Sequence, residues 1–207
     1  MQIILGSGSK RFIIALIRSD IHIKKDFRYK ERDEEKRKEF EEKLKKFRSQ
    51  DIVFIDESGF DHQMIKERCW CPKGQKIIGE KAGGSRGRTS VIAGLCVGKI
   101  KAPCYFNGHT DTVVFCAWLE QMLLPELTPG QVVVIDNASF HPKKKTAEIL
   151  ARKGCFALFL PPYSPDLNPI EQYWAWCKNK IKSMWQMDMT FYKKLDVVLT
   201  AKYGISI

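Results

Sequence analysis

Two short apolar runs decide the fold of this chain: IVFID at residues 52–56 and QVVVID at residues 131–136. Each run has the length and the β-branched composition of a strand that is buried on both faces. We therefore predict two buried strands that end at Asp56 and at Asp136. Carboxylates at strand ends lie at the mouth of an α/β sheet, where ligands bind. Two such aspartates point to one shared cleft, although either one alone is more typical of a turn or a cap.

The surrounding patterns alternate between strands and helices. Strands at 89–97 and 100–106 flank a turn at Gly98-Lys99, which predicts a β-hairpin. The further elements that we predict are a helix at 110–124 with Val114, Trp118 and Met122 on one face, a helix at 143–153, a short strand at 155–160 and a helix at 169–183. This order predicts an α/β fold in which a mixed sheet is flanked by helices.

The two ends of the chain have a different character. Residues 30–48 carry dense mixed charge, and Phe40, Leu44 and Phe47 form one narrow stripe, which predicts a solvated helix that packs one edge on the main domain. We divide the chain into a leader and charged helix at 1–50, a main domain at 51–183 and a helical tail at 184–207.

Composition narrows the partners of the protein. The 207 residues include 35 Lys and Arg against 24 Asp and Glu, a net charge of +11. Such an excess favours a polyanion, most often nucleic acid and less often an anionic membrane, although a basic but ordinary enzyme is the alternative. The apolar run at 12–17 is far shorter than the roughly 20 residues of a membrane span, and no cleavage site follows it. We therefore expect no membrane partner and no signal peptide.

The cysteines indicate a reducing compartment. Their number, seven, is odd, and they are scattered, which suits free thiols in a cytosol. Cys69 and Cys71 form one C-x-C pair, but no second pair completes a zinc site, so two alternating strand residues are favoured over metal ligands.

A third acid joins the two aspartates. Asn168 is a good N-cap, Pro169 suits the first helical position, and Glu171 falls on the third. Glu171 either closes a capping box with Asn168 or offers its carboxylate to a metal ion at the helix start. Three carboxylates from two strand ends and a helix start are suited to a pair of Mg²⁺ ions acting on a phosphodiester.

Three stretches together resemble a known family: IVFIDESGF, VVVIDNASFH and LPPYSPDLNPIEQYWAWCKNKIK. They are similar to the catalytic domain of the DDE transposases of the mariner superfamily, specifically its bacterial insertion-sequence branch. The resemblance covers about residues 26 to 183, and the 34 residues between Asp136 and Glu171 are a spacing typical of that superfamily. The PYSPDLNPIE block is its most diagnostic piece.

The resemblance implies both a fold and an activity. It implies a ribonuclease-H-like fold, with Asp56, Asp136 and Glu171 as the metal-binding catalytic triad. The implied cofactor is a pair of Mg²⁺ ions, for which Mn²⁺ substitutes. The implied reaction is hydrolytic nicking at transposon ends, followed by attack of the freed 3′-hydroxyl on double-stranded target DNA, usually at a TA dinucleotide. Processing two ends implies a homodimer, and the implied location is the bacterial cytoplasm, associated with the nucleoid.

Several residues around the acids are candidates for supporting roles. We expect Asn137 to bind the carboxylates or a metal-bound water, and His141 to contact a scissile phosphate or orient a carboxylate, although purely structural roles are equally open. We expect the DNA contacts at Arg86, Arg88, Lys143, Lys144, Lys145 and Tyr163, the last by stacking on an unpaired base. We assign Tyr173, Trp174 and Trp176 to the core or an interface, because their helix must pack on the sheet.

The chain departs from the family before Asp56. Only some 50 residues precede it, and they contain no complete helix-turn-helix. We therefore keep open a truncated, non-catalytic DNA-binding or inhibitory fragment, and a separate helix-turn-helix partner chain. Another ribonuclease-H-like nuclease is a third alternative, which the PYSPDLNPIE block disfavours.

Overall fold

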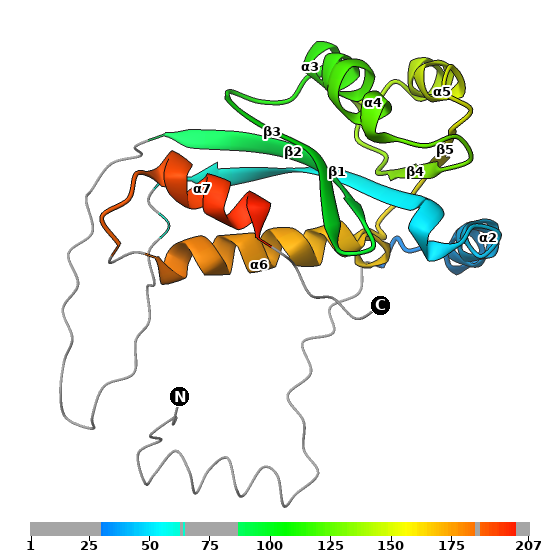
Figure 1. Ribbon diagram of the computed structural model, residues 1–207. Coiled ribbons are helices and arrows are strands. Elements are labelled where there is room, and N and C mark those ends of the chain that lie inside the picture. Colours follow the sequence, from blue (N-terminus) through cyan, green and yellow to red (C-terminus); the bar gives the residue numbers. More distant parts are fainter. Residues whose placement is uncertain (1–29, 63, 65–86, 185–186, 202–207) are drawn as a thin grey trace, which may run out of the picture. The chain divides into compact units, whose positions relative to one another are not determined.

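The computed structural model describes residues 30–62, 64, 87–184 and 187–201, and Figure 1 shows them in colour. All of these except Lys30 belong to one compact unit, Glu31–Ile65 with Ser85–Ile207. The second unit, Met1–Lys30 with Lys66–Gly84, falls almost wholly outside the described residues, as do Arg86, Cys69 and Cys71.

A five-stranded mixed sheet forms the centre of the described unit. Its strands lie in the order β3-β2-β1-β4-β5. The strands are β1 (Ile52–Asp61), β2 (Arg88–Cys96), β3 (Lys99–Asn107), β4 (Val132–Ile135) and β5 (Phe156–Phe159). The first three pair antiparallel, whereas β1, β4 and β5 pair in parallel. The predicted hairpin is confirmed, because Val97 and Gly98 turn between β2 and β3 with positive φ angles of 47° and 71°.

The first strand is longer than predicted. We expected it to end at Asp56, but β1 continues to Asp61, with Asp56 opposite Ala93 and Asp61 opposite Arg88 in the ladder with β2. The parallel neighbour β4 stops earlier, at Ile135. Asp56 therefore lies inside β1, at the level where its parallel partner ends, because the antiparallel ladder with β2 continues to pair the backbone beyond that point.

Helices cover both faces of the sheet (Figure 1). One face packs against α3 (Thr112–Trp118), the π-helical turn η2 (Leu119–Leu123), α4 (Leu124–Glu126) and α5 (Lys143–Ala151). Over β1 and β2, the opposite face packs against α6 (Pro169–Ser183) and α7 (Phe191–Thr200). Over β1, β4 and β5 that face packs against α2 (Glu34–Leu44), through Phe40. The alternation of side chains along each strand produces these two apolar surfaces.

The helix predicted at 110–124 presents a different face from the one expected. It begins after Asp111, whose carboxylate accepts a hydrogen bond from Val114 N at 2.8 Å, and it turns π-helical from Leu119. The π turn moves the inward position one residue along, so that Leu123 is fully buried and Met122 is 39% exposed. The assignment of Met122 to the packed face was therefore wrong.

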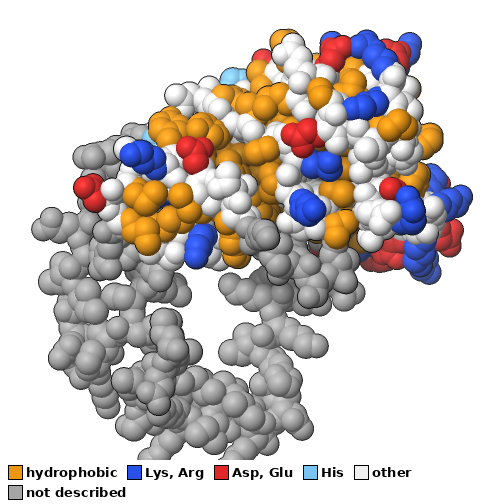
Figure 2. All heavy atoms as spheres, viewed as in Figure 1, with side chains coloured by type: hydrophobic (Ala, Val, Ile, Leu, Met, Phe, Trp, Pro, Cys, Tyr) orange, Lys and Arg blue, Asp and Glu red, His pale blue; other side chains and the backbone are white. Residues whose placement is uncertain are grey.

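The charged helix and the tail pack as helices on the domain. The helix predicted at 30–48 is confirmed as α2, which is capped by Asp33 and buries Phe40. Figure 2 shows acidic and basic side chains interspersed over this helix, at the right of the view. Within the tail, α7 buries Leu195, Val198 and Leu199 in the same apolar cluster as α6. Of the helices described, none has both the length and the apolar character that crossing a membrane requires.

Candidate active site

Asp56 and Asp136 lie level with each other on neighbouring chain segments. The parallel register pairs Ile52 with Val132 and Phe54 with Val134. Continued by two residues, this register brings Asp136, the residue after β4, to the level of Asp56. The side chain of Phe54 lies on the face covered by α6 and α2, and the period of two along a strand places Asp56 on that face as well.

The helix α6 contacts Asp56 directly. The indole Nε1 of Trp174 donates a hydrogen bond to Asp56 Oδ2 at 3.1 Å. Trp174 is 2% exposed and meets Phe60 edge-to-face, with ring centroids 5.9 Å apart. Our prediction of a core position for Trp174 is confirmed, but the sequence analysis missed its second contact, with a carboxylate of the candidate site. A buried indole N–H needs a hydrogen-bond acceptor, and this need was the available signal.

Glu171 lies in the first turn of α6 and is not part of a capping box. Asn168 is the N-cap, but its side chain forms no capping hydrogen bond; instead its Nδ2 donates to the carbonyl of Ile55 at 3.3 Å. Among the described residues, the Glu171 carboxylate forms no hydrogen bond or ion pair. The capping alternative is therefore contradicted, and Asn168 fastens the start of α6 to β1 beside Asp56.

Electrostatic repulsion couples the three acids. Burial, followed by the charges of Glu171, Glu57 and Asp136, raises the pKa of Asp56 to about 8. Burial also raises the pKa of Glu171; Lys178 opposes this shift and the charge of Asp136 adds to it. The charges of Glu171 and Asp136 thus oppose ionisation of Asp56, and the charge of Asp136 opposes ionisation of Glu171.

Asp136 is held by its own loop and by His141. Burial raises the pKa of Asp136, but the contact with His141 and a hydrogen bond from Ala138 N at 2.9 Å outweigh it, and the net shift is downward. His141 Nδ1 lies 2.7 Å from Asp136 Oδ1, and His141 Nε2 lies 3.1 Å from Glu57 Oε1. The structure thus brings His141, predicted as a supporting residue, into contact with Asp136.

Glu57 is an acid that the sequence analysis missed. His141 is 5% exposed, its ring lies 4.1 Å from that of Phe115 on α3, and Glu57 and Asp136 flank it. Burial lowers the pKa of His141, but the two carboxylates outweigh this effect and raise it to about 9. The two flanking carboxylates therefore favour the charged imidazolium form of His141. The position of Glu57, next to Asp56 in a buried strand, was the available signal.

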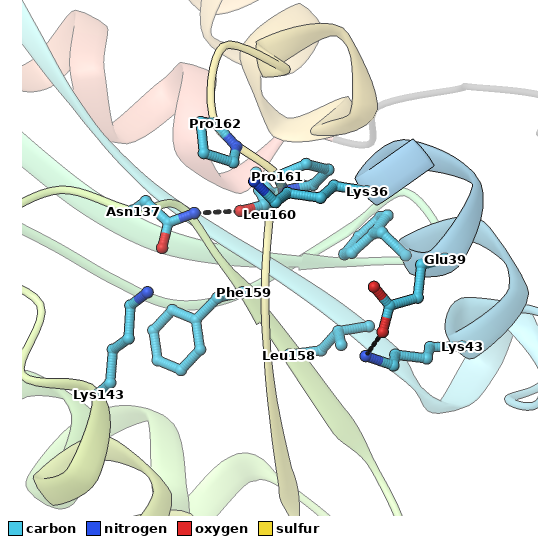
Figure 3. Close-up of a pocket in the computed structure, with 11 residues that line it drawn as sticks. Lys36, Glu39, Lys43, Asn137, Lys143, Leu158, Phe159, Leu160, Pro161 and Pro162 are labelled. Carbon is cyan, nitrogen blue, oxygen red and sulfur yellow. Dashed lines mark hydrogen bonds and ion pairs between the residues drawn. The ribbon is translucent and has the colours of Figure 1, made fainter. Parts of the chain in front are cut away.

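Asn137, the residue after Asp136, borders a pocket (Figure 3). Its Nδ2 donates to the carbonyl of Leu160, which joins the ends of the β4 and β5 segments. The cavity has a volume of about 200 Å³ and is lined by Lys36, Glu39, Phe40, Lys43, Asn137, Lys143, Leu158, Phe159, Leu160, Pro161 and Pro162. The amide nitrogen of Asn137 is therefore engaged with the backbone, which is the structural role left open above.

The predicted DNA-contacting residues lie in different surroundings. Lys143, Lys144 and Lys145 are at the start of α5, and Lys143 Nζ lies 5.2 Å above the ring of Phe159. Arg88 is exposed at the start of β2, and its guanidinium occupies the space where a side chain at Gly59 would lie. Tyr163 is 52% exposed, with a positive φ of 55°. Arg86 lies outside the described residues.

The donor set of the candidate site suits a hard divalent cation in its chemistry, although not in the spacing of its side chains. Asp56, Asp136 and Glu171 offer only carboxylate oxygens, the ligands that Mg²⁺ prefers. Burial, with a further contribution from neighbouring carboxylates, raises the pKa of Asp56 and of Glu171, and a bound cation would offset both effects. Within the described ranges, no three His, Cys, Asp or Glu side chains converge closely enough to hold an ion.

The sequence of residues 51–190 matches the family described as DDE superfamily endonuclease. The chain belongs to the DDE superfamily of endonucleases. Its DDE domain is similar in structure to the Mos1 strand transfer complex, with 16% identity, a TM-score of 0.59, and coverage of 92% of this chain and 67% of that one. The catalytic domain of the Mos1 mariner transposase matches over 86% of each chain, with 14% identity and a TM-score of 0.57.

A third solved structure, the mariner Mos1 paired-end complex with Mg, has 16% identity and a TM-score of 0.56, over 92% of this chain and 67% of that one. No curated protein matches the sequence. At such identities the structural likeness bears on the fold alone. With the strand order of the sheet, it establishes that the DDE domain has a ribonuclease-H-like fold, as predicted.

Proposed function

We propose that this chain is the catalytic domain of a transposase of the bacterial insertion-sequence branch of the mariner superfamily. It hydrolyses a phosphodiester at each transposon end and joins the freed 3′-hydroxyl to target DNA. The observation that carries the proposal is the arrangement of the acids. Asp56 and Asp136 are level on neighbouring segments, and Glu171 comes from the helix whose Trp174 binds Asp56.

In this proposal Asp56, Asp136 and Glu171 hold two Mg²⁺ ions, and Mn²⁺ substitutes. When bound, the metal pair supplies activation of the attacking oxygen and stabilisation of the leaving oxygen. Paired-end complexes of Mos1 with Mg and with Mn are among the similar structures, which supports divalent metal use.

The surrounding side chains position the acids. Trp174 holds Asp56 Oδ2, and His141 lies against Asp136 Oδ1, which leaves the other oxygen of each carboxylate to a ligand. Because His141 is itself held by Glu57, rotation of Asp136 is restricted. Asn137 joins the ends of β4 and β5 and thereby fixes the backbone beside Asp136. Such supporting contacts orient metal ligands and tune their affinity.

DNA is the proposed partner. The net charge of +11 and the lysines at 143–145 support binding to a phosphate backbone, with Arg88, Arg86 and Tyr163 as further proposed contacts. Similar structures include a Mos1 paired-end complex with a left transposon end. We further propose that the protein forms a homodimer that processes two transposon ends, and that a partner chain supplies the helix-turn-helix. We also propose that it is associated with the nucleoid. Its catalytic domain would extend from residue 51 to residue 183.

An oligonucleotide assay tests the proposed function. The full chain is incubated with duplex DNA or an RNA–DNA hybrid in Mg²⁺ or Mn²⁺, alongside Asp136→Ala and the exposed control Asp188→Ala. We expect metal-dependent nicking of duplex DNA by the wild type and the control only. If the wild type nicks DNA no more than Asp136→Ala and a reaction without protein do, the result would support the alternative that the chain is a non-catalytic fragment. A preference for the hybrid would support another ribonuclease-H-like nuclease.

A further inference from the structure

An ion pair between a buried arginine and an aspartate whose side chain is 51% exposed fastens α2 to the loop that precedes α6. Arg37 is 8% exposed, and its guanidinium forms a bidentate pair with the Asp166 carboxylate. Nη1 donates to Oδ1 at 3.2 Å, and Nη2 donates to Oδ2 at 2.9 Å. Arg32 pairs with the same carboxylate. Bidentate Arg–carboxylate pairs fix the orientation as well as the distance of the two groups. Residues 129 positions apart in the chain are thus held in one geometry.

Asp166 lies close in sequence to the start of α6, so holding Asp166 in place also restricts the start of that helix. It belongs to the short 3₁₀ turn Pro165–Leu167, which directly precedes the α6 N-cap, Asn168. Asn168 is bound on its other side to the carbonyl of Ile55, the residue before Asp56. The segment leading into α6 is therefore held between α2 and β1, and Glu171 follows it within one helical turn.

Apolar packing supports the same contact. Phe40, one turn after Arg37, is 4% exposed and shares an apolar cluster with Val134 and Leu160. Leu167, next to Asp166, packs against that cluster. The helix α2 is thus seated on the strand that leads to Asp136 and on the loop that leads to Glu171. The ion pair therefore acts between two rigid elements.

The other ion pairs that hold lysines of α2 join residues close in sequence, and neither partner in them is buried. Lys43 and Glu39 pair at 2.6 Å, but their side chains are 53% and 62% exposed and both belong to α2. Lys36 pairs with Asp33 of the helix N-cap, again locally. Exposed local pairs contribute little to stability or geometry. Burial also raises the pKa of Asp166, but the two arginines outweigh it and lower the pKa.

We propose that Arg37, together with Arg32, is a positioning residue for the active site: by holding Asp166 it fixes the start of α6 and so the place of Glu171 beside Asp56. The matched family region begins at residue 51, so α2 lies outside it. The inference rests on the proposed function, because it assigns Arg37 a part in the metal site of that reaction. Arg37 itself contacts neither substrate nor metal in this role.

Three single variants of the full chain test the role. Arg37→Met keeps length and removes the pair, Arg37→Lys keeps charge and removes the bidentate grip, and Lys43→Met removes a surface pair from the same helix as the matched control. The first readout is Mn²⁺ binding followed by electron paramagnetic resonance, which needs no cleavage. We expect Arg37→Met to weaken Mn²⁺ binding by less than the roughly 10-fold to 100-fold that follows the loss of a direct hydrogen bond to a metal ligand, because Arg37 acts through Asp166 and the start of α6. The Mn²⁺ affinity of Arg37→Lys should lie between those of Arg37→Met and the wild type. The affinity of Lys43→Met should equal that of the wild type.

The second readout is hydrogen exchange of the amides at 170–173, in the first turn of α6. The exchange rate should be higher in Arg37→Met than in the wild type, and it should be unchanged in Lys43→Met. The proposal is overturned if Arg37→Met and Lys43→Met agree in both readouts. Should Arg37→Met fail to fold, Arg37→Lys and Asp166→Asn decide the question by the same comparison.

Failure of the proposed function would be visible separately. A wild type that binds Mn²⁺ but does not nick DNA contradicts the proposed reaction, while the Mn²⁺ and exchange comparisons still decide whether Arg37 positions the site.

Discussion

The indole nitrogen of Trp174 lies 3.1 Å from Asp56 Oδ2, so the core of the domain and its candidate metal site share one hydrogen bond. Trp174 packs in the apolar cluster between α6 and the sheet, and its polar edge reaches the carboxylate of β1. This bond fixes α6, which carries Glu171, against the strand that carries Asp56.

Replacing Trp174 with phenylalanine should separate its two roles. The ring remains, but the carboxylate of Asp56 loses its buried donor, and an unsatisfied buried acceptor costs about 1–3 kcal/mol. We expect Trp174→Phe to lower the free energy of unfolding by about that amount and to reduce metal-dependent nicking. Urea unfolding measures the first effect. A double-mutant cycle with Asp56→Ala is the control, and strictly additive losses would contradict a specific bond to Asp56.

The crowding of acids predicts a gain of stability when one charge is removed. Burial and the neighbouring carboxylates oppose ionisation of Asp56. Asp56→Asn should therefore raise the melting temperature of the protein in EDTA at pH 8. The same variant should lose most of the stabilisation that Mn²⁺ gives the wild type, which is about 2.7 kcal/mol at a hundredfold excess over the dissociation constant. Thermal melts with and without Mn²⁺ test both; a destabilised variant in EDTA would contradict repulsion among the acids.

The His141 pair should be costly to break. Glu57 has a side chain only 14% exposed, and His141 neutralises it. His141→Ala leaves that acid buried without its partner, a change that costs about 3–5 kcal/mol. Chemical unfolding of His141→Ala, compared with the exposed control His109→Ala, tests this, and the control should stay within about 0.5 kcal/mol. Adding Glu57→Gln to His141→Ala should recover part of the lost free energy of unfolding. If the double variant loses as much as the two single variants together, His141 and Glu57 are not coupled.

The stabilisation that the Arg37–Asp166 ion pair gives the protein should depend on pH. The pKa of Asp166 is lowered from 3.8 in the folded protein, so its stabilising contribution is full above the unfolded value and is lost as pH falls through the folded value. A double-mutant cycle of Arg37→Met with Asp166→Asn, followed by unfolding at pH 7 and at about pH 3, should show weaker coupling at the lower pH. Equal coupling at both would contradict an ionic contact.

The lysines at the start of α5 should set the salt dependence of DNA binding. Replacing Lys143, Lys144 and Lys145 by alanine should make the slope of log affinity against log salt shallower by about 0.9 for each phosphate that the protein no longer neutralises. Fluorescence anisotropy with duplex DNA over a range of salt measures the slope. Lys43→Ala, on α2, is the single-lysine control; an unchanged slope in the triple variant would remove this surface from the DNA interface.

The elements of the fold were predictable because their signals are local. The apolar runs that end at Asp56 and Asp136, the turn at Gly98 and the Asn168-Pro169 helix start each lie within a few residues. They are enough to predict a mixed sheet flanked by helices. The predicted ribonuclease-H-like fold came from the family resemblance and is confirmed by the strand order and the similar structures.

The remaining features depend on contacts between distant residues. The length of β1 depends on its ladder with β2, and the face of the helix after Asp111 depends on a π turn. The contacts of His141 with Glu57 and of Arg37 with Asp166 join segments 84 and 129 residues apart, and no local pattern encodes them. The capping-box alternative for Glu171 was open at the level of the sequence for the same reason, because the Asn168 side chain binds Ile55 across the fold.

The proposed reaction requires the three carboxylates to act together on DNA. The decisive measurement is nicking of supercoiled plasmid in Mg²⁺ by the wild type, by Asp56→Ala, Asp136→Ala and Glu171→Ala, and by the exposed control Asp188→Ala. We predict that each of the first three substitutions abolishes nicking, while the control nicks as the wild type does. Persistent Mg²⁺-dependent nicking in any one of those three variants would contradict the assignment of the site.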